Sequence, residues 1–191
     1  MVQSFLQLPR GIRAKAGLVL GLCLLTIAFS VFGAAPGHLG IDEIVYHLMT
    51  RSLYAAGSLD VLNGYRDFAS GGFVFPTTFV HDGRLVSQYP AFHSVLALPF
   101  YAAAGYRGLF VLNGLAFCGV VWLCYLIAQR IFANRSLSLT ACLIFILATY
   151  AWDYAQAAWP HSLATLFVAA SVYLALLAGQ SRGTRRAVPP A

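Results

Sequence analysis

Two adjacent carboxylates, Asp42 and Glu43, lie a few residues after a long apolar segment in a 191-residue chain that has only six acidic side chains. Carboxylates at the edge of an apolar region suit two kinds of chemistry, which are the abstraction of a proton from a hydroxyl group and contact with a metal ion. The competing interpretation is structural, because an acidic residue in the first turn of a helix stabilises it by roughly 0.3–1 kcal/mol.

Arginine and histidine side chains occur in the same region of the sequence, so acid, base and phosphate-binding groups are found together. Arginine side chains are common donors to phosphate oxygens. The candidate substrate-binding residues of these types are His47, Arg51, Arg66, Arg84, His93, Asp153 and His161. Asp153 fits equally well as the polar end of an apolar segment, and His161 as the cap of the helix that follows Pro160.

The composition places the chain in a lipid bilayer. Hydrophobic residues make up 60% of the sequence and charged residues only 9%, and the mean hydropathy is +0.74. A soluble domain of this size could not bury so much apolar surface. The net charge of +6 does not indicate a nucleic-acid partner, because the basic residues form small clusters beside apolar runs and not one patch.

Four segments are predicted to span the membrane, because a hydrocarbon core of about 30 Å requires about 20 apolar residues in a helix. They are residues 17–35, 108–128, 137–152 and 162–178, the third being somewhat short. The first also fits a cleavable secretory signal peptide, since small residues follow its apolar run. The predicted fold class is an all-α polytopic membrane protein with four transmembrane helices.

Three basic clusters set the predicted orientation, because cytoplasmic segments carry an excess of Lys and Arg. The clusters are Arg10, Arg13 and Lys15; Arg130 and Arg135; and Arg182, Arg185 and Arg186. All three fall on one side of a four-span chain. The termini, 1–16 and 179–191, are then cytoplasmic, whereas 36–107 and 153–161 form a long and a short outer loop.

The long outer loop is predicted to hold two helices that lie at the membrane surface. Residues 41–56 place apolar side chains at helical spacing, with Asp42, Glu43 and other polar groups on the rest of the circumference. Residues 91–104 are apolar, but they are too short to span and contain Pro99. The stretch between them suggests an irregular or hairpin-like segment with a turn at 81–83.

Three segments carry a family resemblance. In the first segment, Asp42 and Glu43 are followed by Tyr46 and Gly57. The second segment is residues 82–105, DGRLVSQYPAFHSVLALPFYAAAG, which contains Tyr89. The third segment is residues 154–178, YAQAAWPHSLATLFVAASVYLALLA. In order and spacing they resemble membrane glycosyltransferases of the GT-C fold, the relatives of protein mannosyltransferases and aminoarabinose transferases. One departure is that AF follows the Tyr-Pro pair here, where PG is common in that group.

The resemblance implies transfer of a sugar from a polyprenyl-phosphate carrier to an acceptor hydroxyl, in a bacterial inner membrane and at its outer face. Asp42 would be the general base or the group that orients the acceptor, and Glu43 its partner, which either tunes the charge of Asp42 or binds a metal. The departing polyprenyl phosphate would need positive donors, for which Arg51, Arg66, Arg84 and the histidines are the candidates. Tyr46 and Tyr89 would contribute to substrate binding. No cofactor is implied with certainty, and because a DxD motif is absent, a divalent metal such as Mg²⁺ or Mn²⁺ is optional. Family members have more spans, so the resemblance covers their amino-terminal portion only. It implies a truncated enzyme, or one part of a split enzyme in which a partner chain supplies the missing helices.

Two alternatives from other classes stay open. The chain fits a non-catalytic membrane subunit or degenerate relative that binds polyprenyl lipid or a partner through the same helices. A small transporter fits less well, because none of the four predicted spans carries a charged residue near its middle.

Overall fold

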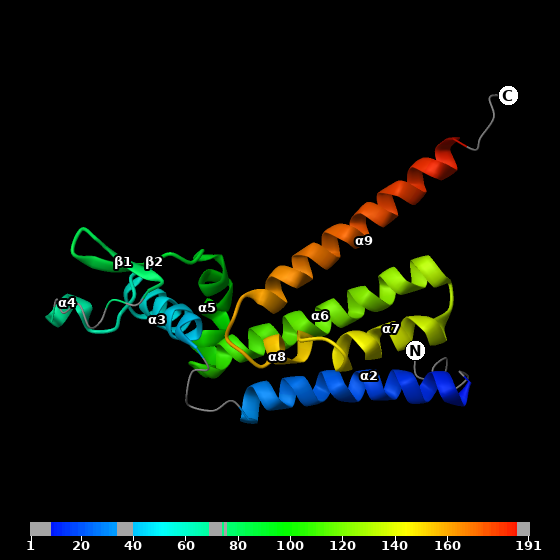
Figure 1. The fold of residues 1–191 in the computed structure, drawn as a ribbon, viewed down its shortest axis with the longest axis horizontal. Helices are drawn as coiled ribbons and strands as arrows, with labels where there is room; N and C mark the ends of the chain where they lie inside the picture. Colours follow the sequence, from blue (N-terminus) through cyan, green and yellow to red (C-terminus); the bar gives the residue numbers. More distant parts are fainter. Residues whose placement is uncertain (1–8, 34–39, 69–73, 75, 187–191) are drawn as a thin grey trace.

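The computed structural model of the protein describes residues 9–33, 40–68, 74 and 76–186, apart from the side chains of Arg66, Phe68 and residues 180–186. Figure 1 shows the arrangement of its elements. The helices are α2 (Arg10–Ala28), which continues as the π-helical turn η1 (Phe29–Gly33), α3 (Ile41–Ala56), α4 (Tyr65–Phe68), α5 (Phe92–Ala104), α6 (Arg107–Phe132), α7 (Arg135–Leu147), α8 (Ala151–Ala155) and α9 (His161–Arg186). The strands are β1 (Thr78–His81) and β2 (Arg84–Ser87).

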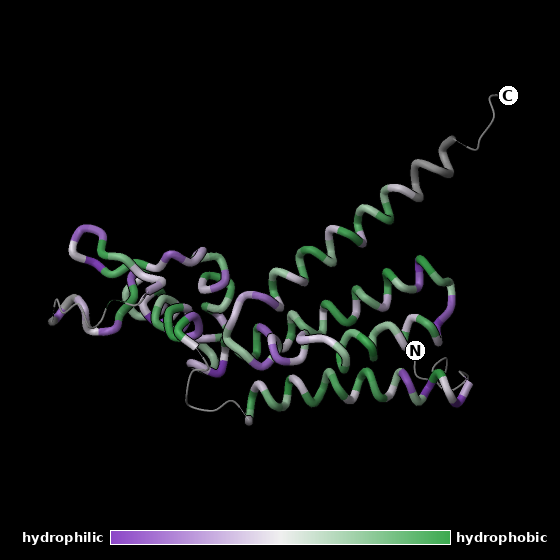
Figure 2. Tube along the Cα trace, in the orientation of Figure 1, coloured by the Kyte–Doolittle hydropathy of each residue, from purple (hydrophilic) through white to green (hydrophobic). Residues whose placement is uncertain are grey.

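Three helices in the described part of the chain are long and apolar enough to cross a membrane. They are α2 with η1, α6, and the segment His161–Gly179 of α9, with mean hydropathies of 2.3, 2.1 and 2.0 in their most apolar stretches. At 1.5 Å per residue even the last extends about 28 Å, close to the thickness of a hydrocarbon core. Figure 2 shows that these helices are largely hydrophobic along their lengths. The helices thus fit an integral membrane protein.

The fourth predicted span, residues 137–152, is not one continuous helix. α7 has only 13 residues, about 20 Å of helix. Thr149 marks the break, because its hydroxyl donates to the Phe145 carbonyl at 2.6 Å and accepts from the Ala151 N–H at 3.1 Å. Local bonds of this kind offer the backbone an alternative to the helix. The chain then begins the separate short helix α8.

Residues 136–158 nevertheless return the chain along the length of the helix bundle. At one end Lys15 Nζ, near the start of α2, donates to Ser136 Oγ at 3.0 Å and to Thr140 Oγ1 at 2.8 Å. At the other end the Ala158 N–H bonds to a side chain of α3. The end of the bundle at Lys15 contains the start of α2 and the α6–α7 turn (Figure 1). We call it the basic end, and define it by Arg10, Arg13, Lys15, Arg130 and Arg135.

The helices extend beyond the spans predicted from hydropathy alone. α2 begins at Arg10, and α6 covers Arg107–Phe132. α9 continues to Arg186, so much of the predicted tail 179–191 is helical. The reason is that Arg, Lys and Gln are good helix formers and do not end a helix where the apolar run ends. The terminal predictions for 1–8 and 187–191 lie outside the described residues, as does the loop entry at 34–39.

α3 and α5 occupy the ranges in which the sequence predicts helices, but their apolar sides meet each other. Tyr46 and Met49 of α3 pack with Ala97 of α5 and with Leu109 and Phe110 of α6 in one core cluster. The buried side of α3 therefore agrees with the predicted one only in part: Val45 is fully buried as expected, but the buried side is rotated toward Glu43, Tyr46 and Met49. Ile41, expected on the apolar face, is 43% exposed, whereas Glu43 is fully buried.

β1 and β2 form the antiparallel hairpin predicted from the sequence, with His81 opposite Arg84. Asp82 and Gly83 at the turn have φ angles of 49° and 70°, which is the geometry that a two-residue type I′ turn requires and Asp-Gly favours. Leu85 of β2 packs with Val45 of α3 and Val61. This contact attaches the hairpin to α3 and sets the position of the segment that follows β2.

Candidate active site

Asp42 lies in the first turn of α3, half-buried, and accepts a hydrogen bond at Oδ1 from the hydroxyl of Tyr89. Tyr89 follows β2, and its N–H donates to Ser87 Oγ at 2.9 Å, which fixes the turn that directs its ring toward α3. Residues 47 positions apart in the sequence therefore meet at one carboxylate. The contact joins the first segment singled out in the sequence, residues 42–57, to the second, residues 82–105.

Tyr46 lies between Tyr89 and His93. Its ring stacks on Tyr89 with centroids 5.2 Å apart and meets His93 edge-on at 5.1 Å. Burial, together with the nearby Tyr89 and Asp42, raises the pKa of Tyr46 to about 12, so its hydroxyl stays protonated at neutral pH. Since Tyr46 is only 4% exposed, it supports the ring of Tyr89 and does not offer a surface to a substrate.

Glu43 points into the protein, and its Oε1 accepts the Ala158 N–H at 2.7 Å. The predicted position on the polar circumference of α3 is thus wrong for Glu43. Neighbouring helical residues point about 100° apart, which directs Asp42 outward and Glu43 inward. The bond fixes the segment between α8 and α9, part of the third segment that carries the resemblance. Glu43 is therefore placed to position the site and not to touch a substrate.

Asn113 of α6 holds the same segment from the other side. Its Nδ2 donates to the carbonyls of Ala157 and Trp159, both at 2.6 Å. Its Oδ1 therefore faces His93 Nε2 at 3.3 Å, and because an amide oxygen only accepts, Nε2 must carry the proton. His93 is 3% exposed, and this burial lowers its pKa. Among the described residues its Nδ1 is buried without a hydrogen-bond partner, so the ring is neutral.

The other candidates of α3 lie away from Asp42. His47 is half-buried, with Nε2 3.3 Å from the Tyr101 hydroxyl and its ring 4.7 Å from that of Tyr106. Arg51 follows Asp42 by nine residues, which puts it about 13 Å along the helix and on the opposite side. It lines a separate cavity of about 880 Å³ together with Asn63, Asp67 and neighbouring residues.

The remaining arginines are not brought to Asp42 by any described contact. The guanidinium of Arg84, on the exposed side of the hairpin, lies 3.8 Å from the carboxylate of Asp60. Arg66 belongs to the short helix α4, and its side chain lies outside the described part of the structure. The donors for a leaving phosphate that the sequence suggested are therefore not assembled around Asp42 by the described residues.

The last two candidates are exposed and flank the segment that Glu43 and Asn113 hold. Asp153 lies in the first turn of α8, and His161 is the first residue of α9. The ring of His161 stacks on Tyr154 with centroids 4.6 Å apart and planes within 3°. Both residues thus face solvent beside the site, with His161 held by its aromatic neighbour.

A metal site is not formed by the described side chains, because no group of three or more His, Cys, Asp or Glu residues lies close enough together to hold an ion. The described residues therefore offer no set of ligands for the Mg²⁺ or Mn²⁺ ion that the sequence analysis treats as optional. Glu43, its candidate ligand, is fully buried against Ala158.

Asn113 is the residue of this site that the sequence analysis did not select. The signal was present, because Asn113 is a lone amide within a predicted apolar span. Polar side chains at such positions hydrogen-bond to neighbouring segments, since lipid offers them no partner. The partner carbonyls of Ala157 and Trp159 carry no sequence signal, because every residue has a carbonyl group.

Comparisons of this chain with known protein families, with curated proteins and with solved structures find no match. The site is therefore defined by its own geometry, an outward carboxylate supported by an aromatic stack and by a buried polar network.

The buried neutral His93 predicts a pH dependence of stability. Its pKa is lowered in the folded protein, so between that value and about 6.5 the unfolded chain binds the proton and the folded chain does not. Stability should therefore fall as pH falls below about 6.5, by up to about 1.4 kcal/mol per pH unit from this group. Unfolding in detergent at pH 7.5 and 5.5 measures the slope. His93→Gln should reduce it, and an unchanged slope in that variant would contradict the assignment.

Proposed function

We propose that the chain is a membrane glycosyltransferase of the GT-C type, or a part of one, that transfers a sugar from a polyprenyl-phosphate donor to an acceptor hydroxyl. The observation that carries the proposal is the hydrogen bond from Tyr89 to Asp42, because it joins two segments that separately resemble this group of enzymes. The bond between Glu43 and Ala158 adds the third segment. Their convergence supports the proposal, since sequence order alone does not require the three to meet.

In this proposal Asp42 is the catalytic base. The bond from Tyr89 uses Oδ1 and holds the carboxylate in one orientation, which leaves Oδ2 to accept the proton of the acceptor hydroxyl. As that proton moves, the acceptor oxygen bonds to C1 of the sugar. The bond from C1 to the phosphate oxygen breaks on the opposite side, so the configuration at C1 inverts. The electron pair leaves with the polyprenyl phosphate.

The leaving phosphate needs positive donors, and the described arginines do not contact Asp42. We propose that further transmembrane helices, in a partner chain or a longer form of the protein, supply them. A divalent ion held with such a partner is an alternative source of positive charge.

The proposed orientation places the basic end of the bundle in the cytoplasm and Asp42 outside a bacterial inner membrane. Single cysteines test it in a variant that lacks the four native cysteines. Asp82→Cys, at the hairpin turn, should react with a membrane-impermeant thiol reagent from outside. Ala133→Cys, in the α6–α7 turn, should react only after the membrane is opened. Reaction of Ala133→Cys in intact cells, with Asp82→Cys protected, would reverse the orientation and remove the proposed site from the outer face.

The proposed activity is tested by release of polyprenyl phosphate from a polyprenyl-phosphate sugar in vesicles that contain the protein and an acceptor alcohol. The reaction is run with the chain alone and with a partner protein that supplies further helices. Release that depends on both the chain and the acceptor is the expected result. If neither preparation releases polyprenyl phosphate from any of a panel of sugar donors, the chain is a binding subunit and not a transferase.

A further inference from the structure

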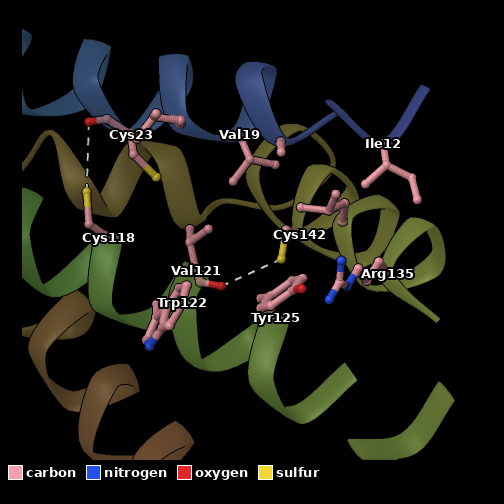
Figure 3. A pocket seen from close by; sticks show the side chains of 12 residues that line it. Ile12, Val19, Cys23, Cys118, Val121, Trp122, Tyr125, Arg135 and Cys142 are labelled. Atoms are coloured by element: carbon pink, nitrogen blue, oxygen red, sulfur yellow. Dashed lines mark hydrogen bonds between the residues drawn. The ribbon is translucent and has the colours of Figure 1, made fainter. Parts of the chain in front are cut away.

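An apolar cavity of about 500 Å³ lies between α2, α6 and α7 at the basic end, far from Asp42. Figure 3 shows its lining, which runs from Ile12 to Cys23 on α2 and includes Trp122 and Tyr125 on α6. Arg135, at the start of α7, is the one charged residue among the described residues that line it. The volume falls within the range of about 300–1,000 Å³ that is usual for ligand sites.

The length of the cavity matches one leaflet of a bilayer. Ile12 and Cys23 are eleven residues apart on α2, which corresponds to about 16 Å of helix. Half of a hydrocarbon core of about 30 Å is nearly the same length. Trp122 at the rim is 61% exposed, so the cavity is accessible from the side of α6 that faces lipid. An acyl chain that enters from the membrane would lie along α2.

In the described part of the chain, the positive charge of Arg135 at the cavity has no carboxylate beside it. All six side-chain carboxylates of the sequence lie between Asp42 and Asp153, in the segments that form the opposite end of the molecule. Lys15 lies beside the start of α7, where its ammonium bonds only to the hydroxyls of Ser136 and Thr140 in the described contacts. Lys15 and Arg135 therefore have no carboxylate partner among the described residues, and an anion at Arg135 would supply the missing charge.

We propose that this cavity is a binding site for an anionic phospholipid of the leaflet at the basic end, separate from the proposed catalytic site. One acyl chain fills the apolar space between α2, α6 and α7. The phosphate contacts the guanidinium of Arg135, whose planar donors fit two phosphate oxygens, with Lys15 nearby. A zwitterionic lipid offers the same chain but brings its own cation to the basic end.

The test is native mass spectrometry of the protein released from nanodiscs that contain equal amounts of phosphatidylglycerol and phosphatidylcholine. We expect one retained lipid per chain, with phosphatidylglycerol preferred roughly fivefold, the effect of about one cation near an anionic surface. Arg135→Gln should abolish the preference, and Arg135→Lys should keep most of it. The matched control is Arg107→Gln, at the opposite end of α6, which should leave the preference unchanged.

A second variant tests the cavity without altering charge. Ala16→Phe places a ring in the apolar space and should remove the retained lipid, with a thermal melt to show that the variant is folded. Equal retention of both lipids by the unchanged protein would overturn the proposal, as would an equal loss of preference in Arg107→Gln. Retention of no lipid would show that protein, a second copy or another helix, covers the cavity, and would also overturn it.

Discussion

Asp42→Asn is expected to slow sugar transfer by about 10²–10⁴-fold, the usual cost of losing a general base. The amide has the size of the carboxylate, can still accept the bond from Tyr89 and retains capping ability at the start of α3. What it loses is the negative charge and the ability to take a proton from the acceptor hydroxyl. Transfer rates measured in vesicles at saturating donor separate this loss from weaker substrate binding.

Two variants distinguish the base from its surroundings. Tyr89→Phe removes the hydrogen bond to Asp42 Oδ1 but keeps the ring that stacks on Tyr46, so it should cost less than Asp42→Asn. Glu43→Gln alters a residue that is buried against Ala158 and should act mainly on stability. If Glu43→Gln abolished transfer while its melting temperature stayed the same, the roles assigned to the two carboxylates would be reversed.

Asn113→Ala is expected to give the largest loss of stability among single changes at the site. The substitution leaves the carbonyls of Ala157 and Trp159 and the Nε2–H of His93 without their partner. Each buried polar group left unpaired costs about 1–3 kcal/mol. The free energy of unfolding, measured by titration with a denaturing detergent, should fall by at least the cost of one unpaired group, about 1–3 kcal/mol. The segment 156–160 should also become sensitive to protease.

Asn134→Ala is the matched control. Asn134 is exposed and caps α7 by accepting the N–H groups of Ser136 and Leu137, so its loss should cost about 1 kcal/mol. It should also leave the segment 156–160 resistant to protease. Equal losses in the two variants would mean that the Asn113 network does not stabilise the site beyond an ordinary helix cap.

The sequence predicts the elements of this fold better than it predicts their packing. Apolar runs locate α2, α6 and α9, and the Asp-Gly pair at 82–83 locates the hairpin turn, because these features depend on local sequence. Helix periodicity identified the buried side of α3 only in part, because it included Val45 but not Glu43 or Met49. That side is chosen by the partner helix α5, which covers Tyr46 and Met49, so an exposed isoleucine and a buried glutamate occur in one turn.

The break after α7 and the network around Asn113 depend on single hydrogen bonds that hydropathy does not detect. Thr149 bonds both to the end of α7 and to the start of α8, although the apolar run continues through Ala151 and Trp152. Asp42 and Tyr89 could be selected from their segments, but that they contact each other follows from the hairpin, which turns the chain back onto α3. Long-range contacts of this kind are set by the whole fold.

The measurement that tests the catalytic role of Asp42 most directly is the initial rate of polyprenyl phosphate release by Asp42→Asn relative to the unchanged protein. Asp82→Asn, an exposed carboxylate change at the hairpin turn, is measured in the same vesicles as the control, and thermal melts show that all three proteins are folded. The account predicts a loss of about 10²–10⁴-fold for Asp42→Asn and a normal rate for Asp82→Asn. Release by a folded Asp42→Asn variant at the rate of the unchanged protein would contradict it and leave Asp42 as a charged helix start.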